Sequence, residues 1–143
     1  GPEPYLVYTW RAGIKQSGSL FKEISALELA GAFQDWPGTL INLQRAPRAD
    51  ELPAPGADFT ACNDDLEDML ALMALIDEVV GVSNTNMHLR AAVGGKAHVL
   101  VTHPAEYRWM ASGDTSPWFP DFRLYRQGAD GSWSTALAAL RRN

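Results

Sequence analysis

The sequence contains few of the residues that form disulfides, metal centres or membrane spans. Cys62 is its single cysteine, so no disulfide can form within the chain, and we expect an inert buried thiol at this position. Its three histidines, His88, His98 and His103, stand at no ligand spacing with a cysteine pair, and no metal site is predicted. No apolar run approaches a membrane-spanning length, and no signal peptide is recognisable. We therefore expect a cytoplasmic protein.

Positive charge is also scarce. Twelve Lys and Arg residues against seventeen Asp and Glu residues give a net charge of −5, which argues against a general nucleic-acid binder. A hydrophobic content of 46% and five tryptophans indicate a folded protein, and 143 residues suit one domain that spans the whole chain. Gly1-Pro2 resembles the scar of a removed tag. We therefore expect a segment of a longer protein, with its N-terminal partner domain missing.

Apolar, β-branched segments alternate with segments of helical periodicity. We expect strands at 5–10, 39–44, 58–62, 79–82, 98–102 and 122–126. We expect helices from Ser25 to about Asp35, from Asp64 to about Ile76 behind an Asn63 cap, after Thr85, and from a Ser132 cap through Leu140. This alternation predicts a Rossmann-like three-layer α/β/α fold with a mostly parallel sheet of about six strands.

The turn after the predicted strand 79–82 is the first candidate site. It supplies hydroxyl, amide and imidazole groups from Ser83, Asn84, Thr85, Asn86 and His88, and no carboxylate. Ligands of open α/β folds bind beyond the carboxyl ends of the strands, and a helix that starts there with free N–H groups attracts anions. A ligand phosphate is therefore one interpretation of this turn. The alternative is an ordinary helix cap that binds nothing.

The preceding predicted helix provides a contrast. Its first turns carry the carboxylates Asp64, Asp65, Glu67 and Asp68. These groups complement the positive end of their own helix dipole, so that helix has little attraction left for an external anion. We interpret them as a solvated helix start rather than as paired acid–base catalysts.

The loop 11–22 is the second candidate site. Arg11, Lys15 and Lys22 lie there among small residues that include Gly13, and such a loop could cradle a diphosphate. It is not a Walker A loop, because Ser19-Leu20 stands where that motif has Lys-Ser/Thr, and the sequence has no G-x-G-x-x-G. The alternative is a surface loop with solvated lysines.

A loop at 103–121 is rich in aromatic residues and proline. Trp109, Trp118 and Phe119 would be costly to leave exposed. We expect them to pack in the core, with a missing partner domain or a stacked base or sugar as alternatives.

Three groups of residues carry a resemblance to a known family. Val80–Leu89 (VGVSNTNMHL), followed by Ala91–Gly94 (AAVG), resembles the S-V-D-T-x-x-x-H-L-A-x-A-L-G signature of family 9-like glycosyltransferases. Tyr8–Gly13 (YTWRAG) is similar to the I-S-W-R-G-G strand and loop of their bacterial tetratricopeptide-repeat subgroup. Tyr107–Trp109 (YRW), Ser116–Pro120 (SPWFP) and Leu124–Gln127 (LYRQ) resemble the W-R-W, S-P-W-Y-P and L-F-R-Q of that subgroup. The resemblance covers nearly the whole chain in the correct order.

The resemblance implies the C-terminal, donor-binding half of a two-domain GT-B glycosyltransferase. The residues that it implies for the donor diphosphate are Arg11, Gly13, Lys15, Asn84, Thr85, Asn86 and His88, and Gln44 would lie near the nucleoside. The general base would belong to the missing N-terminal half, so no catalytic residue is named here. A nucleotide-activated sugar is the implied substrate, with no cofactor or metal. The implied acceptor is a protein such as flagellin, recognised by tetratricopeptide repeats.

Three positions differ from the family pattern. Asn84 replaces the aspartate of the D-T pair, Ala12 replaces a glycine, and Arg90 replaces a small residue, as a surface change or an added phosphate contact. Two other functions stay open. One is a degenerate Rossmann-like interaction module, and the other is a nucleotide-sugar hydrolase or epimerase that would use His88 or His103. The sequence leaves the sugar, nucleotide, acceptor and oligomeric state unassigned.

Overall fold

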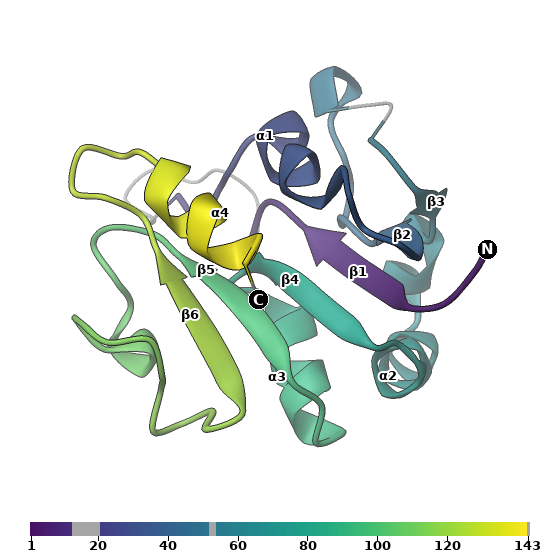
Figure 1. Ribbon diagram of the computed structural model, residues 1–143. Coiled ribbons are helices and arrows are strands. Elements are labelled where there is room, and N and C mark those ends of the chain that lie inside the picture. Colours follow the sequence, from purple (N-terminus) through teal and green to yellow (C-terminus); the bar gives the residue numbers. More distant parts are fainter. Residues whose placement is uncertain (13–20, 52–53, 143) are drawn as a thin grey trace.

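The fold is a three-layer α/β/α arrangement around one parallel sheet (Figure 1). The computed structural model describes residues 1–12, 21–51 and 54–142. Its strands are β1 (Tyr5–Thr9), β2 (Thr39–Asn42), β3 (Ala57–Asp58), β4 (Glu78–Val82), β5 (Ala97–Val101) and β6 (Phe122–Arg126). Within these residues the sheet has six strands in the order β3-β2-β1-β4-β5-β6, and every pairing is parallel. The predicted Rossmann-like fold class is therefore confirmed.

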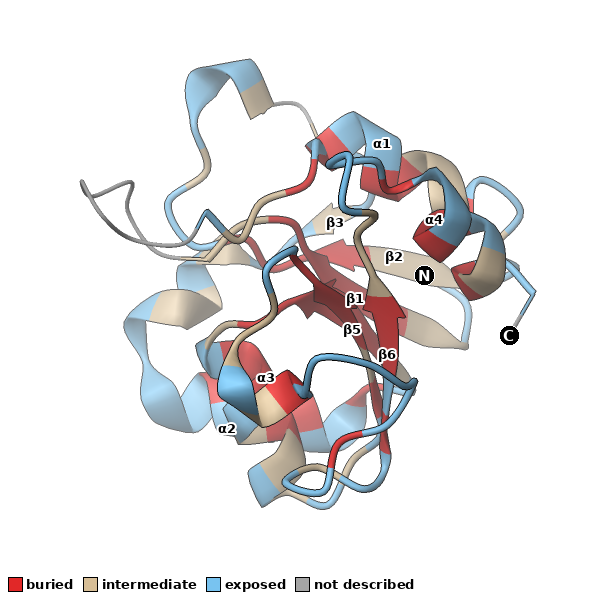
Figure 2. Ribbon diagram, turned by 90° about the vertical axis from the view of Figure 1, so that its left-hand side faces the viewer, coloured by how far each residue is buried: buried red, intermediate tan, exposed pale blue. Residues whose placement is uncertain are grey.

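Helices cover both faces of the sheet. The α-helices are α1 (Ala26–Ala30), α2 (Leu66–Leu75), α3 (Thr85–Ala92) and α4 (Ser134–Leu140), and the 3-10 helices are η1 (Gly31–Phe33), η2 (Ala49–Glu51), η3 (Thr60–Asp64) and η4 (Tyr107–Trp109). The α1 and α4 helices lie on one face, and α2 and α3 lie on the other (Figures 1 and 2). None of the helices in the described ranges is long and apolar enough to cross a membrane.

Alternation along the central strands explains why both faces are buried. In β1, Leu6 and Tyr8 pack with the α1 and α4 residues, whereas Val7 packs with the α2 and α3 residues. The sheet interior is accordingly buried on both sides (Figure 2). Parallel strands covered on both faces are expected to be mostly apolar, and Leu6–Tyr8 of β1 and Val79–Val82 of β4 follow that rule.

The direction in which strands are added to the sheet reverses between β1 and β4, which are neighbours. In such sheets, ligands bind outside the carboxyl ends of the strands at this switch point. Gly81 of β4 stands opposite Thr9 of β1 at that place. A Cβ atom on Gly81 would lie 2.3 Å from Thr9 Oγ1 and 2.7 Å from the Thr9 carbonyl oxygen, so only glycine permits this close approach.

The predicted strand at 58–62 is wrong. β3 ends at Asp58, and the next residues form the 3-10 helix η3. The Asp58 carboxylate accepts a hydrogen bond from the Thr60 amide at 2.9 Å, which turns the chain out of the sheet.

The predicted Asn63 cap is also wrong. α2 begins at Leu66, and the side chain of Asp65 accepts from the amides of Glu67 and Asp68. The Asn63 amide instead donates to the carbonyl oxygens of Leu43 and Thr60, which fixes η3 against the end of β2.

Arg90 is neither a surface residue nor a phosphate contact. It is buried, and its guanidinium donates to the carbonyl oxygens of Met73, Ile76 and Asp77 at the C-terminal end of α2 and to that of Lys96. The last carbonyl groups of a helix have no partner within the helix, so Arg90 satisfies them.

The expectation of core packing for the aromatic loop holds in part. Trp109 is buried and packs against Phe119 and Phe122 over the α3 face of the sheet. Tyr107 and Trp118 are largely exposed, which corrects the prediction for Trp118.

Candidate functional site

The start of α3 is fixed by Asn84. Its side-chain oxygen accepts from the Asn86 amide at 3.0 Å, and its side-chain nitrogen donates to Thr9 Oγ1 at 2.8 Å. One hydrogen bond caps the helix, and the other joins it to the end of β1. The first turn of α3 carries no acidic residue, so its positive dipole end is not neutralised by its own sequence.

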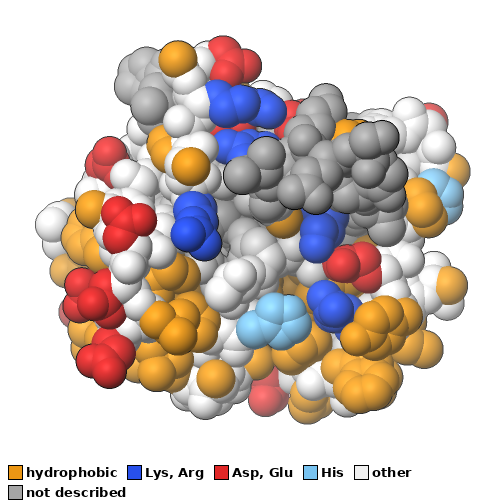
Figure 3. All heavy atoms as spheres, turned by 180° about the vertical axis from the view of Figure 1, so that it is seen from behind, with side chains coloured by type: hydrophobic (Ala, Val, Ile, Leu, Met, Phe, Trp, Pro, Cys, Tyr) orange, Lys and Arg blue, Asp and Glu red, His pale blue; other side chains and the backbone are white. Residues whose placement is uncertain are grey.

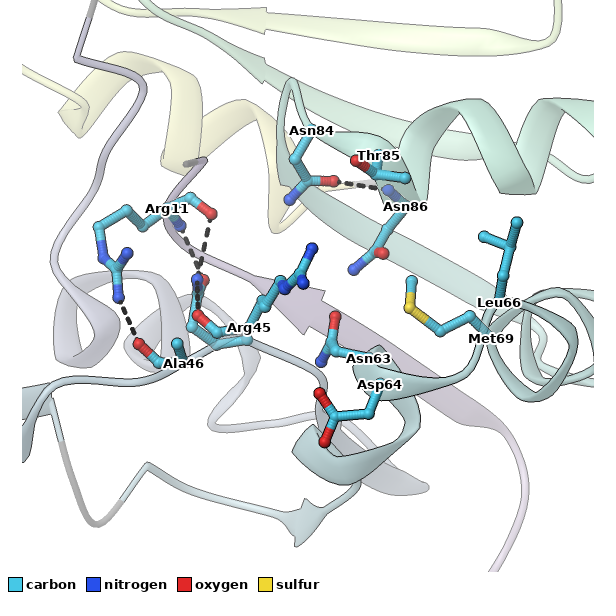
Figure 4. A pocket seen from close by; sticks show the side chains of 11 residues that line it. Arg11, Arg45, Ala46, Asn63, Asp64, Leu66, Met69, Asn84, Thr85 and Asn86 are labelled. Atoms are coloured by element: carbon cyan, nitrogen blue, oxygen red, sulfur yellow. Dashed lines mark hydrogen bonds between the residues drawn. The ribbon is translucent and has the colours of Figure 1, made fainter. Parts of the chain in front are cut away.

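A cleft of about 730 Å³ opens at this place (Figure 4). Its walls come from the carboxyl ends of β1 and β2, from η3 and the start of α2, and from the start of α3. The residues that line it are Arg11, Gln44, Arg45, Ala46, Asn63, Asp64, Leu66, Met69, Asn84, Thr85 and Asn86. The cleft therefore lies at the switch point of the sheet, where a Rossmann-like fold binds its ligand.

The side-chain amide of Asn86 is a hydrogen-bonding group that the cleft makes available to a ligand. This residue is only 5% exposed, and its side chain points into the cleft (Figure 4). Within the described ranges its side chain makes no hydrogen bond. This amide is therefore available to donate a hydrogen bond to a ligand in the cleft.

Two arginines border the cleft and differ in their partners. Arg11 Nε lies 2.9 Å from Glu51 Oε1, and its Nη2 donates to Glu51 Oε2 and to the Ala46 carbonyl oxygen. Much of its charge is therefore already compensated. Arg45 is exposed, and its guanidinium forms no ion pair or hydrogen bond in the part of the chain that the structure describes. Among the described residues that line the cleft, Arg45 is the cation that remains available to an anion.

Glu51 remains ionised beside Arg11. Burial alone would raise the pKa of its carboxyl group, but hydrogen bonds from Arg11 and the Arg48 amide, with a further influence of the nearby Trp10 side chain, outweigh burial and lower this pKa to about 2. Its negative charge therefore persists at neutral pH and holds the Arg11 side chain at the rim of the cleft.

Gln44 is buried, and both the oxygen and the nitrogen of its side-chain amide form hydrogen bonds with the backbone. Its oxygen accepts from the amides of Trp10 and Arg11 at 3.0 and 2.9 Å, and its nitrogen donates to the carbonyl oxygens of Arg11 and Arg45. This geometry makes Gln44 a residue that positions the loops after β1 and β2. A contact between Gln44 and the nucleoside of a ligand stays a prediction.

His88 lies apart from the other predicted residues. It does not line the cleft, and its ring packs edge-on against Phe119 with centroids 5.5 Å apart. Burial and the charge of Arg108 lower the pKa of its imidazole, so neutral pH favours the uncharged form. Of the remaining predicted residues, Gly13 and Lys15 lie outside the described ranges.

The structure thus brings together five of the predicted residues and adds others. Arg11, Gln44, Asn84, Thr85 and Asn86 meet at one cleft. The residues that the sequence analysis had not assigned to a site are Arg45, Ala46, Asn63, Asp64, Leu66 and Met69. A search for cations directly after predicted strands would have found Arg45. The apolar wall of Leu66 and Met69 has the pattern of an ordinary core-facing helix.

The described residues contain no group of three or more His, Cys, Asp or Glu side chains placed to hold a metal ion.

Comparisons with known proteins give one distant relative. No protein-family profile matches the chain. The protein FlbA of Caulobacter vibrioides is 26% identical over 154 aligned residues, which cover 98% of this chain and 25% of FlbA. The chain thus spans about a quarter of the length of that relative. No solved structure matches the chain.

Proposed function

We propose that this chain is the donor-binding domain of a glycosyltransferase and holds a nucleotide-activated sugar in the cleft at the switch point. The observation that carries the proposal is the start of α3, which has no acidic residue in its first turn and presents to the cleft the side-chain amide of Asn86, an amide without a hydrogen bond among the described residues. With Arg45 nearby, these groups form a set of hydrogen-bond donors and positive charge that suits a phosphate. The resemblance to family 9-like glycosyltransferases supplies the reaction class.

The cleft has a second, less polar side. Leu66 and Met69 of α2 form an apolar wall, and Asn63 adds an amide next to it. Such a mixture of apolar surface and a few polar groups suits a nucleoside. The phosphates would then lie at the start of α3, with the nucleoside toward α2.

Charge stabilisation is the chemistry that these residues would supply. When the sugar leaves, negative charge builds up on the departing phosphate oxygens. The N–H groups at the start of α3 and the Arg45 guanidinium would stabilise that charge without having to move. The base that activates the acceptor would come from another domain, so the isolated chain would bind donor without turnover.

The remainder of the protein enters the proposal through the resemblance. It predicts an N-terminal glycosyltransferase domain, tetratricopeptide repeats and a protein acceptor such as flagellin in the cytoplasm. The FlbA match is consistent with a larger architecture, since three quarters of that relative lie outside the aligned part.

A second candidate function is an interaction module without catalysis. The exposure of Tyr107 and Trp118 favours it, because exposed aromatic side chains frequently mark contacts with partners. This alternative predicts that the cleft residues have no role in function.

Calorimetric titration of the chain with UDP, GDP, ADP and CMP tests the proposal. We expect saturable binding of one nucleotide, weakened about tenfold or more by Arg45→Ala and by Asn86→Ala, since each removes a hydrogen-bond donor to phosphate. Arg142→Ala is the matched control, because Arg142 is exposed near the C-terminus and does not line the cleft. Absence of binding by the folded chain, or equal binding by all variants, would contradict the proposal.

A further inference from the structure

A second polar cluster lies at the carboxyl edge of the sheet, in the loop after β5. Its centre is Glu106, which directly precedes η4. Glu106 Oε1 lies 3.2 Å from Lys22 Nζ and 3.6 Å from Arg108 Nη1, and Glu106 Oε2 accepts from Trp109 Nε1 at 3.2 Å. We call Lys22, Ser83, Glu106 and Arg108 the Glu106 cluster. None of these residues lines the cleft described above.

The carboxylate at the centre of this cluster is ionised and held in place. Burial would raise the pKa of the Glu106 carboxyl group, but Ser83, Lys22 and Arg108 together lower it. The Ser83 hydroxyl is fully buried and makes no hydrogen bond of standard geometry among the described residues, although it lies close enough to influence this carboxylate. The cluster therefore presents a fixed acceptor between two cations, and all three of these side chains remain partly exposed.

Exposed aromatic rings stand beside this cluster. Tyr107 is 72% exposed and Trp118 is 62% exposed, and their rings meet edge to face with centroids 6.2 Å apart. The Arg108 guanidinium lies 5.0 Å from the centre of the Tyr107 ring, which joins the aromatic pair to the Glu106 cluster. Large apolar faces in water are unfavourable, and a ligand that covers them would gain hydrophobic free energy.

The cluster adjoins the cleft at the start of α3. Ser83 of the cluster directly precedes Asn84, which caps α3 and lines the cleft. The charges of Arg108, Glu106 and Lys22 all influence the pKa of the His88 imidazole, so the cluster lies near this part of α3. Figure 3 shows acidic, basic and hydrophobic side chains gathered beside one another on one face of the molecule.

We propose that the Glu106 cluster and the Tyr107–Trp118 pair form the subsite for the sugar of the donor, which is a neutral polyhydroxyl ring. This inference rests on the proposed function, since it requires a nucleotide whose phosphates lie at the start of α3. Neighbouring hydroxyls of a sugar would donate to the Glu106 carboxylate and accept from Lys22 and Arg108. An aromatic face would cover the C–H face of the ring. Glu106 would repel a sugar that carries its own carboxylate.

The test compares each nucleotide with its sugar conjugate on the same chain. Calorimetry is performed on the wild-type chain, on Glu106→Gln and on Trp118→Ala. The ligands are UDP, UDP-glucose, UDP-glucuronate, GDP and GDP-mannose. Trp118→Ala changes an exposed side chain, so it remains informative if Glu106→Gln perturbs folding. Glu67→Gln and Phe59→Ala are the matched controls, because both residues lie outside the cluster and the cleft.

We expect both variants to lower the affinity for a neutral nucleotide sugar about tenfold and to leave the affinity for the matching nucleotide unchanged. A loss of about tenfold is the effect of removing one charge-assisted hydrogen bond or one aromatic contact. Parallel changes in nucleotide and nucleotide sugar, or no change in either, would overturn the sugar subsite and leave the proposed function intact. Tighter binding of UDP-glucuronate than of UDP-glucose would overturn the assignment of a neutral sugar. Failure of every nucleotide to bind would overturn the proposed function, and the inference with it.

Discussion

The side chain of Asn84 donates a hydrogen bond to the hydroxyl of Thr9, which links the start of α3 to the end of β1 across the switch point of the sheet. Its oxygen at the same time caps the helix through the Asn86 amide. The glycosyltransferase signature has an aspartate at this position. An asparagine keeps the cap and leaves the cleft without a negative charge at the place where phosphate is expected.

Asn84→Asp should therefore separate stability from ligand binding. A carboxylate can still cap α3 and can accept from the Thr9 hydroxyl, so we expect the free energy of unfolding to be unchanged or raised by about 0.3–1 kcal/mol. The added charge should weaken nucleotide binding. Denaturant unfolding and calorimetry measure the two effects. Asn84→Ala is the comparison, with an expected loss of about 1 kcal/mol of stability, and unchanged nucleotide affinity in Asn84→Asp would contradict a phosphate at this place.

Gly81 provides a test of the close contact between β1 and β4. A Cβ atom there would meet both the side chain and the backbone of Thr9, so we expect Gly81→Ala to lower the free energy of unfolding by about 1–3 kcal/mol. Gly31→Ala is the matched control. Gly31 has helical backbone angles, and no atom lies within 4 Å of its added Cβ. We expect that variant to be neutral or slightly stabilised, and equal unfolding midpoints for both variants would contradict the argument.

Local patterns along the chain were sufficient to predict the fold class. The buried β-branched segments that became β1, β4 and β5 are continuous and apolar, as expected for parallel strands covered on both faces. The turn between β4 and α3 was also predictable, because Asn84 stands directly between an apolar strand and a helical segment. These features depend on neighbours in the sequence.

The wrong predictions depend on competing or distant partners. Asn63 and Asp65 are both good helix caps, and the choice between them was decided by the contact of Asn63 with the Leu43 carbonyl, twenty residues away. Likewise, Arg11 was predicted, together with Lys15 and Lys22, to supply positive charge to the site. Its pairing with Glu51, forty residues away in a proline-rich loop, leaves that role to Arg45. Sequence spacing does not reveal such pairings.

Arg90 is expected to contribute to stability rather than to ligand binding. Arg90→Met keeps the apolar stem and removes every hydrogen bond to the carbonyl groups at the end of α2. Buried acceptors without donors should lower the free energy of unfolding by about 3 kcal/mol. Denaturant unfolding measures this change, with Arg142→Met as an exposed control that should stay within about 0.5 kcal/mol of the wild type. A nucleotide affinity that falls in folded Arg90→Met would argue for a direct ligand contact.

Glu51 should make the stability of the chain depend on acid pH. The pKa of its carboxyl group is lowered in the folded protein to about 2 from an ordinary value of 4.5, because the hydrogen bonds that Arg11 and the Arg48 amide donate to it outweigh its burial. The folded state therefore binds this proton less readily than the unfolded state does. The resulting stabilisation is fully present above about pH 4.5 and is lost as the pH falls toward 2.

Urea unfolding of the wild type and of Glu51→Gln, measured between about pH 7 and about pH 3, tests this dependence. We expect the wild type to be more stable at neutral pH and its advantage over Glu51→Gln to shrink as the carboxylate becomes protonated. Asp121→Asn removes an exposed carboxylate in the loop before β6 and should differ from the wild type by less than about 0.5 kcal/mol throughout. If the difference in free energy of unfolding between the wild type and Glu51→Gln stays constant down to the lowest pH, then Arg11 is not held at the cleft by this ionised carboxylate.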